Sequence, residues 1–190
     1  NKGVIVYPLM KDIFSCLYLT DLKSVKVVII GKDPYRGLLS NGIPISNGLA
    51  FSSNENKQNQ VIGTICKVLQ KTIPGFVNPN HSNLTKWAKQ GILLLNYSLT
   101  IDVNSSHEGL WLEIITVVLK YINKENPNCV YILWGDKVQK LESLIKSKYI
   151  LKDKYPDEWG FKSGFSECNH FNIANNYLKE SGQSEVDWNF

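Results

Sequence analysis

Hydrophobic residues fall into short uninterrupted runs along this chain, and these runs alternate with segments of helical periodicity. Four runs rich in Val, Ile and Leu have the usual length of a buried strand, and they span Val25–Gly31, Gly91–Asn96, Cys129–Gly135 and, more weakly, Lys148–Lys152. Amphipathic helical spacing is found in Gln60–Ile73, Leu110–Ile122, Asp136–Lys148 and His170–Gly182. Because parallel strands need crossover connections, the alternation predicts an α/β fold whose parallel sheet is covered by helices on both faces.

Polar residues and glycines mark where these elements begin and end. Ser105, Ser106 and His107 precede the second helical segment and are expected to cap it, while Gly182 is expected to end the last one. The turn-forming stretch Leu38–Gly48 predicts a surface excursion. No linker or repeat interrupts the pattern, so residues 1–190 are expected to form a single domain.

Composition narrows the class of protein without identifying it. The chain has 190 residues, 43% of them hydrophobic, and a net charge of +4, which suits a polyanionic partner but is too small to prove one. The four cysteines form no CxxC pair, so we expect reduced, buried thiols and assign no metal. No apolar run approaches the roughly 18 residues of a membrane span, and no signal peptide is recognisable. We therefore expect an intracellular protein, and because the sequence lacks an initial Met we expect a missing amino-terminal portion.

Polar side chains follow each of the four expected strands. They are Asp33, Asn96, Asp136 and Tyr155. In open parallel sheets, ligands bind beyond the carboxyl ends of the strands. Each of these residues alone fits an ordinary turn, but four at one edge predict a shared site.

Beginning at GKDPYRG, several motifs occur in a fixed order along the chain. The others are NGLAFS, WAKQGILLLNYSLT, YILWGD and FSECNHF. In these motifs, from about Val6 to Trp188, the sequence resembles the family 1 uracil-DNA glycosylases. The resemblance implies a central four-stranded parallel twisted sheet flanked by helices. It also implies a cofactor-free DNA repair enzyme that flips uracil out of DNA and hydrolyses its N-glycosidic bond, leaving an abasic site.

The resemblance implies roles for five residues of the first half of the chain. Asp33 would stabilise the positively charged sugar and orient a water molecule. The ring of Tyr35 would exclude the methyl group of thymine, and Phe51 would stack on the flipped base. The amide of Asn96 would read the uracil edge, because it offers both a donor and an acceptor. The main chain at Lys32 would contact a base carbonyl.

The sequence departs from the family in its second half. Tyr155 stands where the family has the histidine that donates to the departing uracil, and Trp159 replaces the leucine that enters the duplex. Asp136, Asp157 and Gly160 occupy positions where serines usually clamp phosphates. A carboxylate repels a phosphate, so we expect other side chains to take over the DNA contact, and the candidates are Arg36, Lys32, Lys137, Lys162 and Ser52 or Ser53.

These departures leave an alternative open. The chain could be a catalytically weakened homologue that serves as a DNA-binding or replication-associated subunit. A generic nucleotide-phosphate binder is disfavoured because no Gly-rich phosphate loop follows the first strand. The expected partners are uracil-containing DNA, double or single stranded, and either a proteinaceous glycosylase inhibitor or a replication protein. We expect a monomer, no membrane contact, and a location in the nucleus or cytoplasm depending on the source.

Overall fold

The four apolar runs form one parallel sheet in the computed structural model, which describes residues 4–190. Its strands are β2 (Val27–Gly31), β3 (Ile92–Asn96), β5 (Val130–Trp134) and β6 (Ile150–Asp153). They lie side by side in the order β3-β2-β5-β6, and every neighbouring pair is parallel. All residues of β2, β3 and β5 are buried, as a sheet covered on both faces requires. The expected fold class is confirmed.

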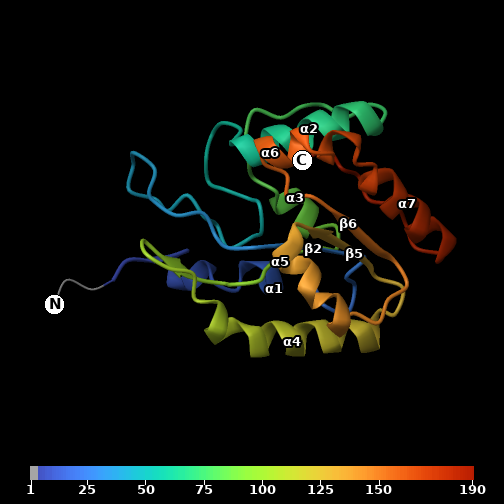
Figure 1. Cartoon of the computed structure of the whole chain (residues 1–190), viewed down its shortest axis with the longest axis horizontal. Coiled ribbons are helices and arrows are strands. Elements are labelled where there is room, and N and C mark those ends of the chain that lie inside the picture. The colour runs from blue at the N-terminus through green and yellow to red at the C-terminus, as the bar shows by residue number, and fades with distance from the viewer. Residues whose placement is uncertain (1–3) are drawn as a thin grey trace.

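Helices cover the two faces of this sheet (Figure 1). The helices α2 (Gln60–Thr72) and α7 (His170–Glu180) pack together on one side, and α4 (Glu108–Glu125) lies along the other. Shorter helices complete the layers: α1 (Ser15–Leu19), α3 (Thr85–Ala88), α5 (Asp136–Gln139) and α6 (Glu158–Lys162). The 3-10 segments are η1 (Met10–Asp12), η2 (Lys140–Leu144) and η3 (Phe165–Glu167). No helix among residues 4–190 is long and apolar enough to cross a bilayer.

The third helical segment differs from its prediction. One helix was expected over Asp136–Lys148, but the chain forms the short α5 and then the 3-10 segment η2. Val138 and Leu141 are buried three residues apart, a spacing that suits the three-residue turn of a 3-10 helix. The side chain of Asn123 also holds the end of η2, because its Nδ2 donates to the Leu144 carbonyl at 2.7 Å.

The capping prediction for α4 is wrong. His107 occupies the N-cap position, and no side-chain hydrogen bond caps the helix. The Ser106 hydroxyl donates instead to Asp33, 73 residues away along the chain. At the other end of the chain, Gly182 does end α7, with its φ at +76° and the amide of Gln183 bonded to the Leu178 carbonyl.

Two smaller predictions are confirmed. The four cysteines are free and buried. The stretch Leu38–Gly48 forms an irregular excursion in which Leu38 pairs with Pro44 as an isolated bridge. A further small sheet was not foreseen: β1 (Val6–Tyr7) pairs antiparallel with β4 (Ile101–Asp102).

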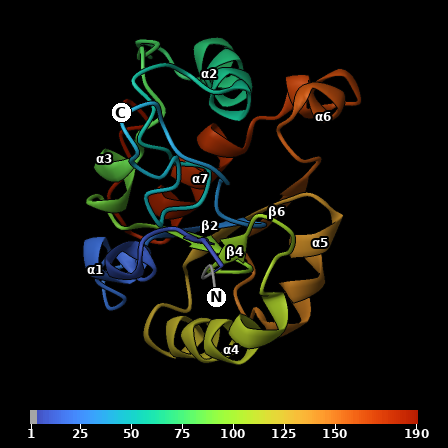
Figure 2. The same cartoon turned by 90° about the vertical axis from the view of Figure 1, so that its left-hand side faces the viewer.

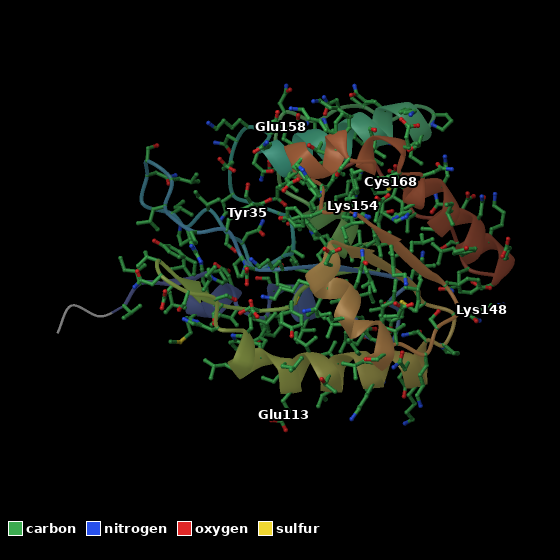
Figure 3. All side chains as sticks on the ribbon, viewed as in Figure 1. Tyr35, Glu113, Lys148, Lys154, Glu158 and Cys168 are labelled. Atoms are coloured by element: carbon green, nitrogen blue, oxygen red, sulfur yellow. The ribbon has the colours of Figure 1, made fainter. Side chains whose placement is uncertain are left out.

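Strand register brings the carboxyl ends of the strands to one edge. Gly31 lies opposite Asn96, and Trp134 lies opposite Asp153. Figure 2 looks at the molecule from the end at which this edge lies, between α4 below and the α2 layer above. Figure 3 shows Tyr35 near this end and Lys148, which precedes β6, at the opposite end. The polar residues that follow the strands therefore face one region of the surface.

Candidate active site

The end of β2 comes unusually close to Asn96. A Cβ atom on Gly31 would lie 2.5 Å from Asn96 Oδ1 and 2.9 Å from the Ala50 side chain. No side chain can be added at that distance without displacing one of these groups. Glycine at position 31 therefore allows the amide of Asn96 to lie at the floor of the site.

Asn96 presents an acceptor that the protein itself does not use. The residue is 3% exposed, and its Oδ1 is buried with no hydrogen-bond partner among the described residues. A buried acceptor without a partner costs roughly 1 to 3 kcal/mol. A ligand that brings an N–H group to this oxygen would remove that cost, which makes Asn96 the strongest sign of a binding site here.

Phe51 forms a wall of the site in a strained backbone conformation. Its φ is +63°, in the left-handed region that costs a non-glycine residue about 1 to 3 kcal/mol. The buried ring packs edge-on against Trp134, with centroids 5.6 Å apart, and tilted against Tyr155 at 5.9 Å. The strain fixes an aromatic face where a planar ligand would stack.

Tyr35 is anchored by the backbone of the same segment. Its hydroxyl donates to the Phe51 carbonyl at 3.3 Å. Burial raises the pKa of Tyr35 well above its ordinary value, so the phenol stays neutral. The proline at position 34 fixes the turn that carries this ring.

Asp33 is mostly enclosed, and both of its oxygens have partners. The Ser106 hydroxyl donates to Oδ1 at 2.5 Å, and the ammonium of Lys32 lies 3.4 Å from Oδ2. The side chain of Asp33 is 13% exposed, whereas that of Lys32 is 53% exposed. The carboxylate is thus held at the site, while the lysine reaches into solvent.

Tyr155 closes the site from the β6 side. Burial and the negative charges of Asp157 and Asp33 raise the pKa of Tyr155 to about 12. Its phenol is therefore a proton-bearing hydrogen-bond donor at neutral pH. Gly135, with φ at +98°, makes room for it, because a Cβ there would lie 3.3 Å from the Cβ of Tyr155.

Together these side chains line one small cavity of about 10 Å³, formed by Gly31, Lys32, Asp33, Tyr35, Phe51, Asn96 and Tyr155. That volume holds about one water molecule. The structure therefore brings together the expected catalytic residues Asp33 and Tyr155 and all four expected base-binding residues. The space between them is smaller than a base, so these side chains must move apart before a base can enter.

Of three residues at expected DNA-contact positions, Ser52 and Asp157 make hydrogen bonds within the fold, and Asp136 lies outside the cavity. Ser52 is fully buried, and its oxygen accepts hydrogen bonds from Asn47 Nδ2 at 2.8 Å and from the Leu84 amide at 2.9 Å, so its hydroxyl cannot reach a phosphate. Asp157 caps α6, accepting from the Gly160 amide at 2.7 Å. Asp136 is exposed at the start of α5 and does not line the cavity. The prediction of a phosphate contact by Ser52 is wrong, whereas a DNA contact by Asp136 stays a prediction.

Two other expected contacts lie on the surface. Arg36 is exposed beside the cavity, and no ion pair to it occurs within residues 4–190. Trp159 is 70% exposed in α6, an unusual place for a large aromatic side chain. Both positions are open to a macromolecular ligand.

A group with metal-ligand chemistry lies behind the cavity. Ligand atoms of Asp153, Cys168 and His170 all lie within 4.8 Å of one another. However, Trp134 Nε1 donates to His170 Nδ1 at 3.1 Å, so the proton of the neutral imidazole is on Nε2, the atom nearer Asp153. Burial also raises the pKa of Cys168 to about 12. With a proton on His170 Nε2 and a protonated Cys168 thiol, these residues do not suit a metal ion.

Sequence reasoning did not identify two residues of this site. Gly31 carried a weak signal, as a glycine that directly follows four branched residues. Ser106 carried none that pointed to Asp33, because only the folding of the β4 segment brings the two together.

No family model matches the chain. Uracil-DNA glycosylases of several Escherichia coli strains, among them SMS-3-5, are 38% identical to it over 194 residues, which cover 99% of this chain and 82% of theirs.

The structural neighbours show the same fold. The crystal structure of mimivirus uracil-DNA glycosylase matches with a TM-score of 0.90 at 23% identity, covering 98% of this chain and 76% of the other. A variant of mimivirus UNG in complex with UGI matches with a TM-score of 0.91 at 24% identity, covering 100% and 78%. The UNG of Nitratifractor salsuginis is more distant, with a TM-score of 0.60, 16% identity and coverage of 93% and 78%.

Proposed function

The chain belongs to the uracil-DNA glycosylase family, and from this premise we propose that it excises uracil from DNA through the cavity around Asp33 and Asn96. The observation that carries the proposed site is the buried, unpartnered Oδ1 of Asn96. Within this family the reaction consumes water and releases free uracil, leaving an abasic site in the DNA. The chain is thus a hydrolase of N-glycosyl bonds in DNA base excision repair.

Base recognition follows from the arrangement of three side chains. Asn96 Oδ1 accepts the imide N–H of uracil, and its NH₂ group donates to the neighbouring carbonyl. Cytosine offers an acceptor where uracil offers that N–H, so it leaves Asn96 Oδ1 without a partner. Phe51 stacks on the base, and Tyr35, fixed by its bond to the Phe51 carbonyl, leaves no room for the methyl group of thymine.

Bond cleavage separates charge, and the site has a group for each charge. The electron pair of the N1–C1′ bond passes to uracil, while the sugar becomes cationic at C1′. Asp33 stabilises this cation and orients the water that adds to C1′. The proton that this water loses balances the negative charge of the departing uracil, which is released as the neutral base. Tyr155 donates to the uracil oxygen that gains negative charge, because its phenol keeps a proton at neutral pH.

DNA binding is part of the proposal and involves the exposed side chains around the cavity. We assign to Trp159 in α6 the role of filling the gap that the flipped nucleotide leaves in the duplex, and to Arg36 a phosphate contact; the exposure of both side chains supports this. The closed cavity implies that the rings of Phe51 and Tyr155 separate as the base enters. The mimivirus complex with UGI supports a proteinaceous glycosylase inhibitor as a partner of this chain. Nucleus or cytoplasm, wherever the DNA lies, is the proposed place of action.

The decisive experiment incubates the protein with a uracil-containing oligonucleotide and measures abasic sites by alkaline cleavage. We expect excision by the wild type and a loss of roughly 100-fold to 1,000-fold in Asp33→Asn, which keeps the shape but removes the charge. An otherwise identical thymine oligonucleotide is the control and should remain intact. Undetectable excision at high protein concentration would reject the proposed enzyme.

The alternative of a weakened, DNA-binding homologue makes a different prediction. It requires DNA affinity with negligible excision, and Tyr155 in place of the family histidine is the observation that favours it. The enclosed carboxylate of Asp33 and the unpartnered acceptor of Asn96 favour the enzyme, since a binding protein has no use for either.

A further inference from the structure

We propose that Ser106 is a positioning residue for the carboxylate of Asp33, an inference that rests on the proposed function. Its hydroxyl donates to Asp33 Oδ1 at 2.5 Å, the short limit for a hydrogen bond from a hydroxyl to a carboxylate. The bond joins the start of α4 to the end of β2, across 73 residues of sequence.

The backbone around Ser106 is fixed by pairing to β4. Ser106 forms an isolated antiparallel bridge with Ile101, and the His107 amide donates to the Thr100 carbonyl at 3.3 Å. In the turn between them, the Asp102 amide donates to the Ser105 carbonyl at 3.0 Å. Ser106 therefore projects from a closed hairpin and not from a free loop.

A chain of side-chain hydrogen bonds fixes the same hairpin. Trp111 Nε1 donates to Thr100 Oγ1 at 2.7 Å, so the Thr100 hydroxyl is free to donate its own proton to His107 Nδ1 at 2.9 Å. With Thr100 as the donor to Nδ1, the N–H of His107 Nε2 points to Asp102 Oδ2, which lies 3.2 Å away. Each donor in this series of hydrogen bonds, from Trp111 to Asp102, therefore has an acceptor.

Asp102 is the last acceptor of this series and also fixes the turn that follows it. Its Oδ1 accepts from the amides of Asn104 at 2.6 Å and Ser105 at 2.7 Å. These backbone bonds, with the bond from His107, lower the pKa of Asp102 to about 2, so it is a permanent acceptor at neutral pH. The turn that carries Ser106 is therefore braced on both sides.

A serine suits position 106 because its hydroxyl is an uncharged hydrogen-bond donor. A carboxylate that stabilises a cationic sugar must keep both its orientation and its negative charge. The ammonium of Lys32 at Oδ2 partly offsets the charge of Asp33, whereas the Ser106 hydroxyl at Oδ1 orients the carboxylate without adding charge. Without Ser106 the carboxylate is free to turn toward Lys32 and away from the substrate.

A matched pair of variants tests the inference. Ser106→Thr keeps the hydroxyl and Ser106→Val removes it, and both β-branched residues suit an extended bridge equally. We expect kcat of the Val variant to fall roughly 10-fold to 100-fold below that of the Thr variant, with KM within about twofold. Ser105→Ala is the control. The Ser105 hydroxyl makes only long contacts, at 3.4 Å and 3.5 Å, to the oxygens of Asp102, which has shorter hydrogen bonds to other groups.

A double-mutant cycle separates positioning from a structural role. In the Asp33→Asn background, replacing Thr by Val at position 106 should change the residual excision rate by less than about twofold, since the group to be positioned is gone. Equal kcat for the Thr and Val variants, or an unchanged loss in the Asp33→Asn background, would overturn the inference. An inactive wild type would reject the proposed function instead, so the two failures are distinguishable.

Discussion

At the residue scale, Tyr155 is the position at which the motif resemblance predicts a histidine and this chain has a phenol. A phenol and an imidazole both donate hydrogen bonds, but a phenol reaches farther from the backbone. The structure accommodates Tyr155 by placing its Cβ against Gly135, which has no side chain to obstruct it. The phenol thereby remains within the cavity, close enough to Asp33 for that charge to help raise its pKa.

The role of Tyr155 is tested by two substitutions. Tyr155→Phe removes the donor and should lower kcat roughly 100-fold to 1,000-fold, while Tyr155→His should keep or raise the wild-type rate. Single-turnover excision measured on one oligonucleotide compares the three forms. Equal rates in all three would remove Tyr155 from the mechanism.

The ratio of the excision rates of wild type and Tyr155→Phe should depend on pH only where the Tyr155 phenol loses its proton. The donor is present below the pKa of about 12 and is lost as the pH rises through it. The rate advantage of wild type over Tyr155→Phe should therefore be constant between pH 7 and about 10, which is the ordinary pKa of a tyrosine. A decline of that advantage centred below pH 10 would contradict the protonated donor.

At the scale of the element, α6 depends on two residues, Asp157 and Gly160, at positions where the resemblance predicts serines. Asp157 caps this helix through the Gly160 amide. Gly160 in turn passes so close to the chain that a Cβ there would lie 1.8 Å from the Tyr155 carbonyl oxygen. A serine at position 160 therefore cannot be accommodated in this backbone without a shift of the chain.

The cap makes a prediction about stability. Asp157→Ala should lower the free energy of unfolding by about 1 kcal/mol, because an N-cap bond is lost, while Asp157→Ser should cost only a few tenths. Urea unfolding monitored by circular dichroism measures both. Asp157→Ser should also bind DNA more tightly, since it removes a carboxylate near the proposed phosphate path. A destabilisation by Ser as large as that by Ala would show that the cap is not the cause.

At the scale of the whole molecule, net charge and ion pairing determine how strongly the protein is expected to bind DNA. Several lysines expected to contact phosphates are paired with carboxylates. Lys137 pairs with Glu108, and Lys162 Nζ lies 2.6 Å from a Glu158 oxygen. With Lys32 beside Asp33, these pairs reduce the positive charge available to DNA, and the net charge is only +4.

We therefore expect a shallow dependence of DNA affinity on salt. The slope of log K against log salt concentration should lie near −1 to −3, about one unit for each phosphate contacted. Arg36→Ala should reduce the magnitude of this slope by about one. Lys179→Ala is the control and should leave the slope unchanged, because Lys179 lies on the distant helix α7 and is paired with Glu185. Fluorescence anisotropy at several salt concentrations gives the slopes. A steep slope in both variants would mean that other basic side chains carry the contact.

The sequence by itself determined the sheet and the half of the site that follows β2 and β3. Strands of branched residues bury both faces, so Val27–Gly31 and Ile92–Asn96 were recognisable from composition alone. Parallel pairing then places the residues that follow them at one edge, which is why Asp33 and Asn96 could be expected together. The motifs added their roles through resemblance.

Only the tertiary structure decided which polar residues are free to act. The Ser52 hydroxyl is of a type that can contact a phosphate, but it is buried and accepts from the Leu84 amide, while Asp157 accepts from the Gly160 amide as a helix cap. Ser106 looked like a helix cap and instead holds Asp33. Local sequence specifies the donors and acceptors that a segment carries, whereas their partners depend on contacts between segments far apart in the chain. The closed cavity, its unpartnered Asn96 oxygen and the Ser106 bond are all products of such contacts.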